Sequence, residues 1–94
     1  MAEPLKPLRA KIDALDDQII DLLAERMDVV REVGATKARE NITLIQSDRV
    51  NEVRERCAER GAKKGVNPEL IRKIYTAIID EAHQMEQLII SSKS

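Results

Sequence analysis

Hydrophobic residues recur along the first part of the chain at alternating intervals of four and three. They are Leu8, Ile12, Leu15, Ile19 and Leu22, followed by Val29, Val30 and Val33. This spacing places the side chains on one face of an α-helix. No proline interrupts residues 8–41. We therefore predict a single helix over this span, which at about 1.5 Å per residue is on the order of 50 Å long.

The next segment predicts a connection followed by a shorter helix. Residues 40–46 lose the charge-rich helical pattern, so we expect a connection that the core partly covers. Ser47 or Asp48 is expected to cap a second helix, and Gly61 and Gly65 bracket its predicted end. Its thin hydrophobic stripe consists of Val50, Val53 and Cys57. We expect this helix to be short and mostly exposed to solvent.

The clearest boundary in the sequence is Asn67-Pro68-Glu69, which predicts the start of a third helix. Asparagine accepts from free backbone amides, proline needs no donor in the first turn, and glutamate is favoured near the positive end of the helix dipole. We expect this helix to reach about Ile90, with residues 91–94 as a frayed tail. Its hydrophobic stripe consists of Ile71, Ile74, Ile78, Ala82, Met85 and Ile89.

Three helices of such unequal length do not close a bundle within one chain. The first helix would extend beyond its neighbours with an uncovered hydrophobic face, and pairing with a second copy removes that exposure. The single aromatic residue, Tyr75, leaves the core to aliphatic side chains, which suits helix packing. We therefore predict an all-α fold with one domain over residues 1–94, assembled as a homodimer.

Composition excludes several classes of protein. The 16 Lys and Arg residues nearly balance 17 Asp and Glu residues, so no overall field attracts nucleic acid or an anionic membrane. Cys57 is the single cysteine, which excludes an intrachain disulfide and a cysteine-based metal site. No stretch resembles a secretory signal or approaches the roughly 18 apolar residues of a membrane span. We expect a cytoplasmic protein.

Arg26 and Lys37 carry the most informative chemistry in the chain. At 100° per residue, both fall in the middle of the hydrophobic face of the first helix rather than on its rim. A buried cation needs a carboxylate partner, a bound anion, or enough reach to bring its charge to water. The two Cα atoms should lie about 16 Å apart along the helix axis. Two long side chains at that separation could hold one small polyanion.

Two further residues have a plain surface interpretation. Arg9 lies on the rim of the same stripe, and the helix rise puts it about 25 Å from Arg26, too far for a shared site within one straight helix. In an antiparallel dimer, Arg9 of one subunit could instead reach the site of the other. His83, the only histidine, lies away from the main stripe of the third helix, and we expect it on the surface.

The order of these features resembles a known family. The first helix contains LRxxIDxLDxxIxxLLAERxxxxxxVGxxK, and SDRV and NPELIRKIYTAIIDEA follow it. This arrangement is similar to the all-helical chorismate mutases across nearly the whole chain. The resemblance implies an intertwined homodimer with two active sites, each receiving one arginine from the other subunit. It also implies a reaction that needs no metal and no cofactor.

The resemblance implies a role for each cation. Arg26 and Arg9 of the partner subunit would bind the two substrate carboxylates. Lys37 would donate to a carboxylate and to the ether oxygen of the breaking bond. Arg49 matches the family's arginine at the start of the second helix. A pericyclic rearrangement needs only a compact reactive conformer and positive charge near the oxygen that becomes negative.

Four positions depart from the usual mutase pattern. Glu86 stands where many members have a glutamine that donates to the ether oxygen, and Ala82 stands where they have a serine near a carboxylate. At the end that binds the ring hydroxyl, Gln46 replaces a common aspartate and Val50 a common glutamate. An ionised carboxylate only accepts hydrogen bonds, so our hypothesis is that Glu86 acts in its protonated form. The alternative is that Glu86 is an exposed helix residue.

Several functions fit this pattern. The leading one is conversion of chorismate to prephenate on the route to phenylalanine and tyrosine. An isochorismate pyruvate lyase is the nearest alternative, because the DRV sequence at residues 48–50 is similar to the ERV of those enzymes. A mutase acting on 4-amino-4-deoxychorismate is a third, which the changes at Gln46 and Val50 permit. A helical dimerisation or regulatory module without activity is the fourth.

Overall fold

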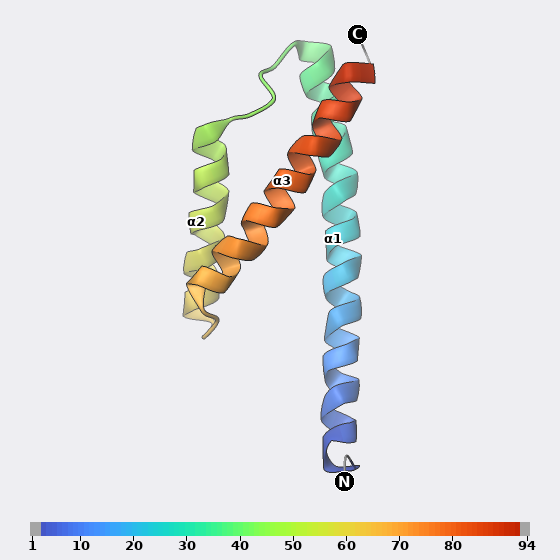
Figure 1. Ribbon diagram of the computed structural model, residues 1–94, viewed down its shortest axis with the longest axis vertical. Helices are drawn as coiled ribbons and strands as arrows, with labels where there is room; N and C mark the ends of the chain where they lie inside the picture. The colour runs from blue at the N-terminus through green and yellow to red at the C-terminus, as the bar shows by residue number, and fades with distance from the viewer. Residues whose placement is uncertain (1–2, 93–94) are drawn as a thin grey trace.

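The computed structural model describes residues 3–92, which form helices joined by short connections (Figure 1). A 3-10 helix at Glu3–Leu5 leads into α1 at Lys6–Glu40, which is followed by α2 at Ser47–Lys63 and α3 at Pro68–Ser92. The described residues contain no β-strand, so the predicted all-α class is confirmed. No helix in this part of the chain has the length and apolar character needed to cross a membrane.

Two predictions about helix starts were wrong in detail. α1 begins at Lys6 rather than near Leu8, because a proline at position 7 fits the first turn of a helix, where no amide donor is needed. Ser47 is the first residue of α2, and Gln46 precedes it without a side-chain capping hydrogen bond. Asp48 instead lies inside the first turn, where its negative charge is favourable beside the free amides.

The connection between α1 and α2 is less covered than predicted. α1 ends at Glu40 and is followed by its capping residue Asn41, which adopts a left-handed conformation with φ of 56°. Only Leu44 is partly buried in the connection, whereas Ile42 and Ile45 are 45% and 53% exposed. These two hydrophobic side chains are therefore only about half covered within one chain.

The turn between α2 and α3 follows the prediction closely. Gly65 has a φ of 82°, and the Val66 amide donates to the Gly61 carbonyl at 2.8 Å, which closes the end of α2. The Glu69 amide donates to Asn67 Oδ1 at 2.9 Å, so the predicted cap is confirmed. α3 then continues to Ser92, beyond the predicted end at Ile90, and the rest of the predicted tail lies outside the described residues.

α3 holds the chain together by packing against both other helices. It crosses the C-terminal half of α1 and lies along α2, while α1 and α2 do not pack against each other within residues 3–92 (Figure 1). Because α3 faces two helices, its most buried residues form a line that is offset from the predicted stripe. Ala82 is the one residue of the predicted stripe that is buried. This line consists of Ile79, Ala82 and Glu86.

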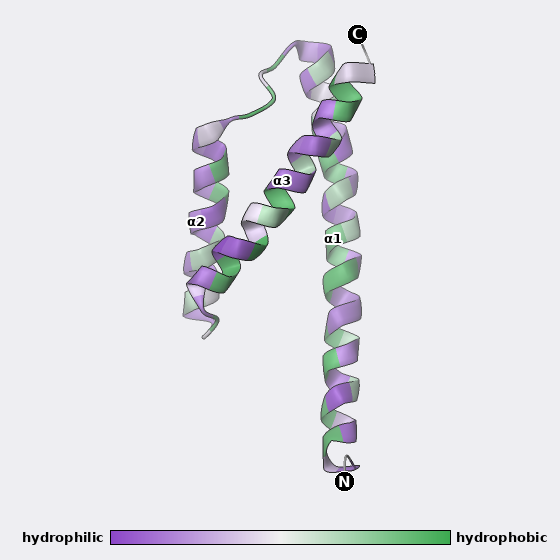
Figure 2. Cartoon of the chain, viewed as in Figure 1, coloured by the Kyte–Doolittle hydropathy of each residue, from purple (hydrophilic) through white to green (hydrophobic). Residues whose placement is uncertain are grey.

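The N-terminal half of α1 extends beyond α2 and α3 (Figure 1). Hydrophobic and hydrophilic residues alternate along this projecting part (Figure 2). Its hydrophobic face is uncovered, as expected for a helix that one chain cannot bury. The residues concerned are 52–56% exposed and comprise Leu8, Ile12, Leu15 and Ile19.

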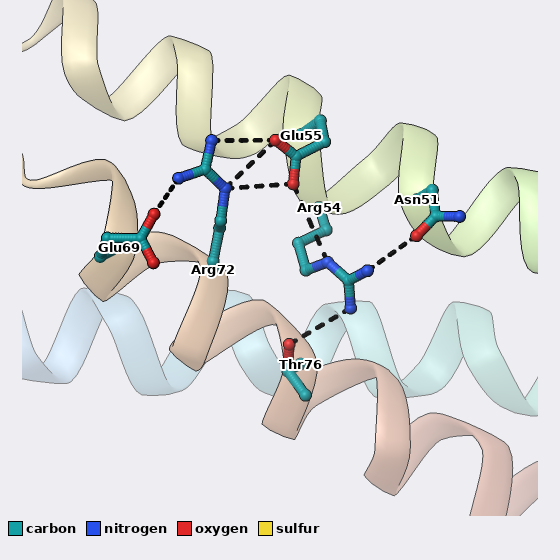
Figure 3. Close-up of polar contacts among 6 residues, drawn as sticks. All are labelled: Asn51, Arg54, Glu55, Glu69, Arg72 and Thr76. Carbon is teal, nitrogen blue, oxygen red and sulfur yellow. Dashed lines mark hydrogen bonds and ion pairs between the residues drawn. The ribbon is translucent and has the colours of Figure 1, made fainter.

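A polar network joins α2 to α3 on the outer surface (Figure 3). Arg72 donates to both carboxylate oxygens of Glu55 on α2, at 2.9 and 3.1 Å, and also to Glu69 on its own helix. Arg54 donates to Asn51 at 2.7 Å. The Arg72 hydrogen bond lowers the pKa of the Glu55 carboxyl below its usual range. The network therefore favours a charged Glu55 in the folded chain.

We expect acid to weaken the packing of α2 on α3 through this carboxyl. The pKa of Glu55 is lower in the folded chain than in the unfolded chain, so its contribution is complete above about pH 4.3, the ordinary glutamate value, and disappears as pH falls below that value. We would measure the free energy of unfolding in urea by circular dichroism at pH 7 and at acid pH. Between these two conditions, Glu55→Gln should lose less of this free energy than the parent. Glu59→Gln is the matched control, because Glu59 pairs only within α2, with Lys63. Equal losses in the parent and Glu55→Gln would contradict the assignment.

Candidate active site

A cavity of about 450 Å³ lies between α1 and α2, with α3 as its third wall. The cavity exists because α3 packs between α1 and α2 and holds them apart. Cationic side chains, one carboxylate and aliphatic side chains share its lining. α1 contributes Arg26, Val29, Val33 and Lys37; the connection and α2 contribute Gln46, Arg49, Val50 and Val53; α3 contributes Ile79, Ala82, His83 and Glu86.

Lys37 lies in the cavity wall with two partners. Its side chain is 12% exposed, and its ammonium donates to Glu86 Oε1 at 2.6 Å and to the Leu44 carbonyl at 2.5 Å. The carboxylate partner that a buried cation requires is therefore present in the chain itself. An ammonium has three donors, so one donor is left for a molecule in the cavity.

Glu86 is brought to Lys37 by a close crossing of α3 over α1. A Cβ atom at Gly34 would lie 3.2 Å from the Glu86 Cα atom, so the glycine permits this approach, and Lys37 follows one turn later on α1. Glu86 is 4% exposed, which makes the alternative of an exposed glutamate wrong. The carboxylate accepts the hydrogen bond from Lys37 and faces the cavity.

Arg26 stands against an aromatic ring. Its guanidinium carbon lies 6.0 Å from the centre of the Tyr75 ring, within the range of a cation–π contact. Burial raises the pKa of the Tyr75 phenol, and a hydrogen bond with the half-buried Cys57 thiol raises it further. The Arg26 guanidinium makes no ion pair with any residue of the described chain. Its hydrogen-bond donors therefore remain for an anion.

The other end of the cavity lies at the start of α2. Arg49 lines it while pairing with Glu52 on the outer side, and the Gln46 amide donates to the Thr43 carbonyl at 2.7 Å. Val50 is half-buried and is the aliphatic part of this end. Ala82 is buried in the α3 wall and offers no polar group to a ligand.

Two sequence expectations have different outcomes. Arg9 is exposed on the projecting part of α1 and does not line the cavity of its own chain, in keeping with the predicted axial separation. His83 is half-buried and lines the cavity, so the prediction of a surface residue was wrong. The apolar stripe misplaced it, because the cavity wall on α3 is wider than that stripe. Ile79 was missed for the same reason.

Charge and shape together restrict what this cavity can hold. Arg26, Lys37 and Arg49 supply three cations, and Glu86 supplies one carboxylate already paired with Lys37. Arg49 also pairs with Glu52, which lies outside the lining. Within the lining the cations exceed the carboxylates by two, so a small molecule with two carboxylates would balance its charge. The aliphatic walls would pack against its carbon skeleton and exclude water, which strengthens the polar contacts inside.

Comparison with known proteins agrees with this geometry. The sequence profile described as chorismate mutase type II matches residues 8–87. A 4-amino-4-deoxychorismate mutase from Streptomyces venezuelae is 32% identical over 90 residues, covering 96% of this chain and 87% of that protein. A protein of the same name from Streptomyces pristinaespiralis is 31% identical, covering 96% and 70%. The bifunctional chorismate mutase/prephenate dehydratase of Escherichia coli is 31% identical over 87 residues, covering 93% of this chain and 22% of that protein.

Proposed function

Because the chain belongs to the chorismate mutase type II family, we propose that it is an isomerase that converts chorismate to prephenate in phenylalanine and tyrosine biosynthesis. The observation that carries this proposal is the cavity in which Arg26, Lys37 and Arg49 converge from α1 and α2. Chorismate has two carboxylates and an ether oxygen that gains negative charge as its bond breaks. Three cations around an aliphatic cavity match that charge distribution.

The rearrangement places specific demands on these side chains. The substrate must fold so that its two reacting carbons approach, and fixed cations on its carboxylates hold that conformer. We assign Arg26 to one carboxylate, with the Tyr75 ring supporting the guanidinium. We also assign Arg49, on the opposite wall of the cavity, to substrate binding. The third donor of Lys37 would stabilise the ether oxygen in the transition state. No nucleophile or cofactor takes part.

Replacement of Tyr75 tests the support of Arg26. Tyr75→Leu removes the ring, so we expect KM for chorismate to rise about two- to fivefold, the range of an exposed to half-buried cation–π contact. Tyr75→Phe keeps the ring and should stay close to the parent. Steady-state kinetics of both variants provide the measurement. An equal rise in both would assign the effect to the phenol and its contact with Cys57.

Glu86 is paired with Lys37 in the free chain, so we assign it to the ether oxygen in the substrate complex after it has taken up a proton, because an ionised carboxylate cannot donate a hydrogen bond. The parent's kcat/KM should then fall as pH rises, whereas Glu86→Gln, with a permanent amide donor, should show a flatter pH–rate profile. Glu81→Gln, an exposed change on the same helix, is the control and should follow the parent. A parent rate that is constant from acid to alkaline pH would contradict this role.

A homodimer would complete the site. The uncovered residues of α1, from Leu8 to Ile19, are more than half exposed, and a second copy of the helix is the surface that matches their spacing. In an antiparallel pairing, Arg9 of the partner subunit would approach the cavity that contains Arg26. It would supply the fourth cation and bind the second carboxylate. The cytoplasmic location expected from the sequence stays a prediction.

One alternative substrate has specific support. The two Streptomyces relatives are named 4-amino-4-deoxychorismate mutases, and Val50 leaves the start of α2 without an acid on the cavity wall. The lack of an acid at Val50 also disfavours 4-amino-4-deoxychorismate on physical grounds. An ammonium on the ring would enter a cavity whose lining contains three cations and one acid, Glu86, which is already paired with Lys37. The neutral ring hydroxyl of chorismate carries no such cost.

Product analysis separates the remaining functions. The purified protein should convert chorismate to prephenate, and it should form no salicylate from isochorismate. Of the three residues on which the similarity to the lyases rests, Arg49 and Val50 line the cavity and Asp48 does not. Salicylate and pyruvate from isochorismate would establish the lyase instead. No turnover of either compound, by a folded protein, would favour a dimerisation or regulatory module.

A further inference from the structure

His83 stands in the cavity wall opposite the first turns of α2. It lines the cavity beside Gln46, Val50 and Ile79, and also a shallower hollow that contains Val50 and Ile79. His83 therefore lies at the Val50 end of the cavity. Its side chain is half-buried and makes no hydrogen bond or ion pair with any residue between positions 3 and 92. The imidazole is a partly buried polar group without a partner in the described part of the chain.

The polar groups of the cavity divide into two kinds. Arg26, Lys37 and Arg49 are cations suited to carboxylates and to the ether oxygen. Gln46 and His83 are an amide and an imidazole, which suit a neutral polar group. Chorismate has one such group, the ring hydroxyl. One N–H of the Gln46 amide already donates to the Thr43 carbonyl, and its second N–H and its oxygen remain available. His83 is the other neutral polar side chain of the lining, and neither of its ring nitrogens has a partner among residues 3–92.

We propose that His83 hydrogen-bonds the ring hydroxyl of the substrate and is the specificity-determining residue at this end of the cavity. The inference rests on the proposed mutase function. A neutral imidazole has one donor and one acceptor nitrogen, so it pairs with a hydroxyl in either direction. It takes over at this end the polar contact that an aliphatic Val50 cannot make.

The test compares two apolar replacements with a polar one. His83→Leu and His83→Ala lack both imidazole nitrogens, and kcat/KM for chorismate should fall about five- to tenfold, the range of one lost hydrogen bond to a neutral group. His83→Gln keeps a donor and an acceptor and should recover most of that loss. Gln84→Ala is the matched control, because Gln84 is exposed and does not line this cavity. Circular dichroism shows which variants keep the parent helicity.

A substrate change separates a direct contact from a structural effect. We would repeat the assay with a chorismate analogue that has hydrogen in place of the ring hydroxyl. On this analogue, kcat/KM of His83→Leu and His83→Ala should fall less than about twofold below that of the parent, because the contact no longer exists. Equal losses on chorismate and on the analogue would overturn the assignment of His83 and leave the mutase function intact. A parent that neither binds chorismate by calorimetry nor converts it would overturn both proposals.

Discussion

Arg26→Ala is expected to lower kcat/KM for chorismate about 100- to 1,000-fold, the loss found when one fixed donor to a developing negative charge is removed. Arg26 lines the cavity, stands against the Tyr75 ring and has donors available for a carboxylate. The substitution removes both a contact to the substrate and the force that holds the reactive conformer. The substitution should therefore lower kcat and also raise KM.

Arg31→Ala is the matched control for this variant. Arg31 lies on the same helix, pairs with Asp28 on an exposed surface and does not line the cavity. Its kcat/KM should stay within about twofold of the parent, since exposed ion pairs contribute little. Both variants should keep the helicity and the association state of the parent. Near-parent kcat/KM in Arg26→Ala would refute the assignment of this cavity as the active site.

Mixing two inactive variants should restore activity. Arg9→Ala and Arg26→Ala each damage both sites of their own homodimer. In a mixed dimer, the Arg26 of one chain and the Arg9 of the other meet in one intact site, while the second site lacks both. Random exchange of equal amounts makes half of the dimers mixed, so activity should return to about a quarter of the parent value. Initial rates after mild denaturation and joint refolding measure this recovery.

Two controls make the mixing experiment decisive. Subunit exchange is checked by native mass spectrometry of chains with different tags. The double variant Arg9→Ala/Arg26→Ala, mixed with the parent, should give no activity beyond that of the parent dimers, because each mixed dimer has one site that lacks Arg9 and one that lacks Arg26. If exchange is demonstrated and the two single variants recover nothing, Arg9 does not act across the subunit boundary.

The fold was predictable because local signals and long-range packing agree. The four-three spacing from Leu8 to Val33 is a property of one long helix. Gly65 marks a helix end through its positive φ, and Asn67 marks a helix start through its side-chain oxygen. The failures were also local. Ser47 has the side chain of a cap but lies inside α2, because the chain leaves the connection one residue earlier than the capping preference suggests.

The candidate site was predictable only in part. Arg26 and Lys37 could be located because a cation in the middle of a hydrophobic face is energetically unfavourable unless it has a partner or a bound anion. Their partners could not be found in this way. Which face of α3 meets α1 depends on the crossing at Gly34, and this crossing buries Glu86 and turns His83 toward the cavity. A single hydrophobic stripe cannot describe a helix that packs against two neighbours.

A competition experiment decides which substrate this cavity serves. Equal amounts of chorismate and 4-amino-4-deoxychorismate are supplied together to the purified protein, and both compounds and their products are followed by NMR in one sample. The ratio of their consumption gives the ratio of kcat/KM directly. The three cations of the cavity lining, and the absence of an acid from the part of the lining that the connection and α2 contribute, predict that chorismate is consumed first and that prephenate accumulates. Preferential loss of the amino compound, or no prephenate at all, would contradict the proposed function.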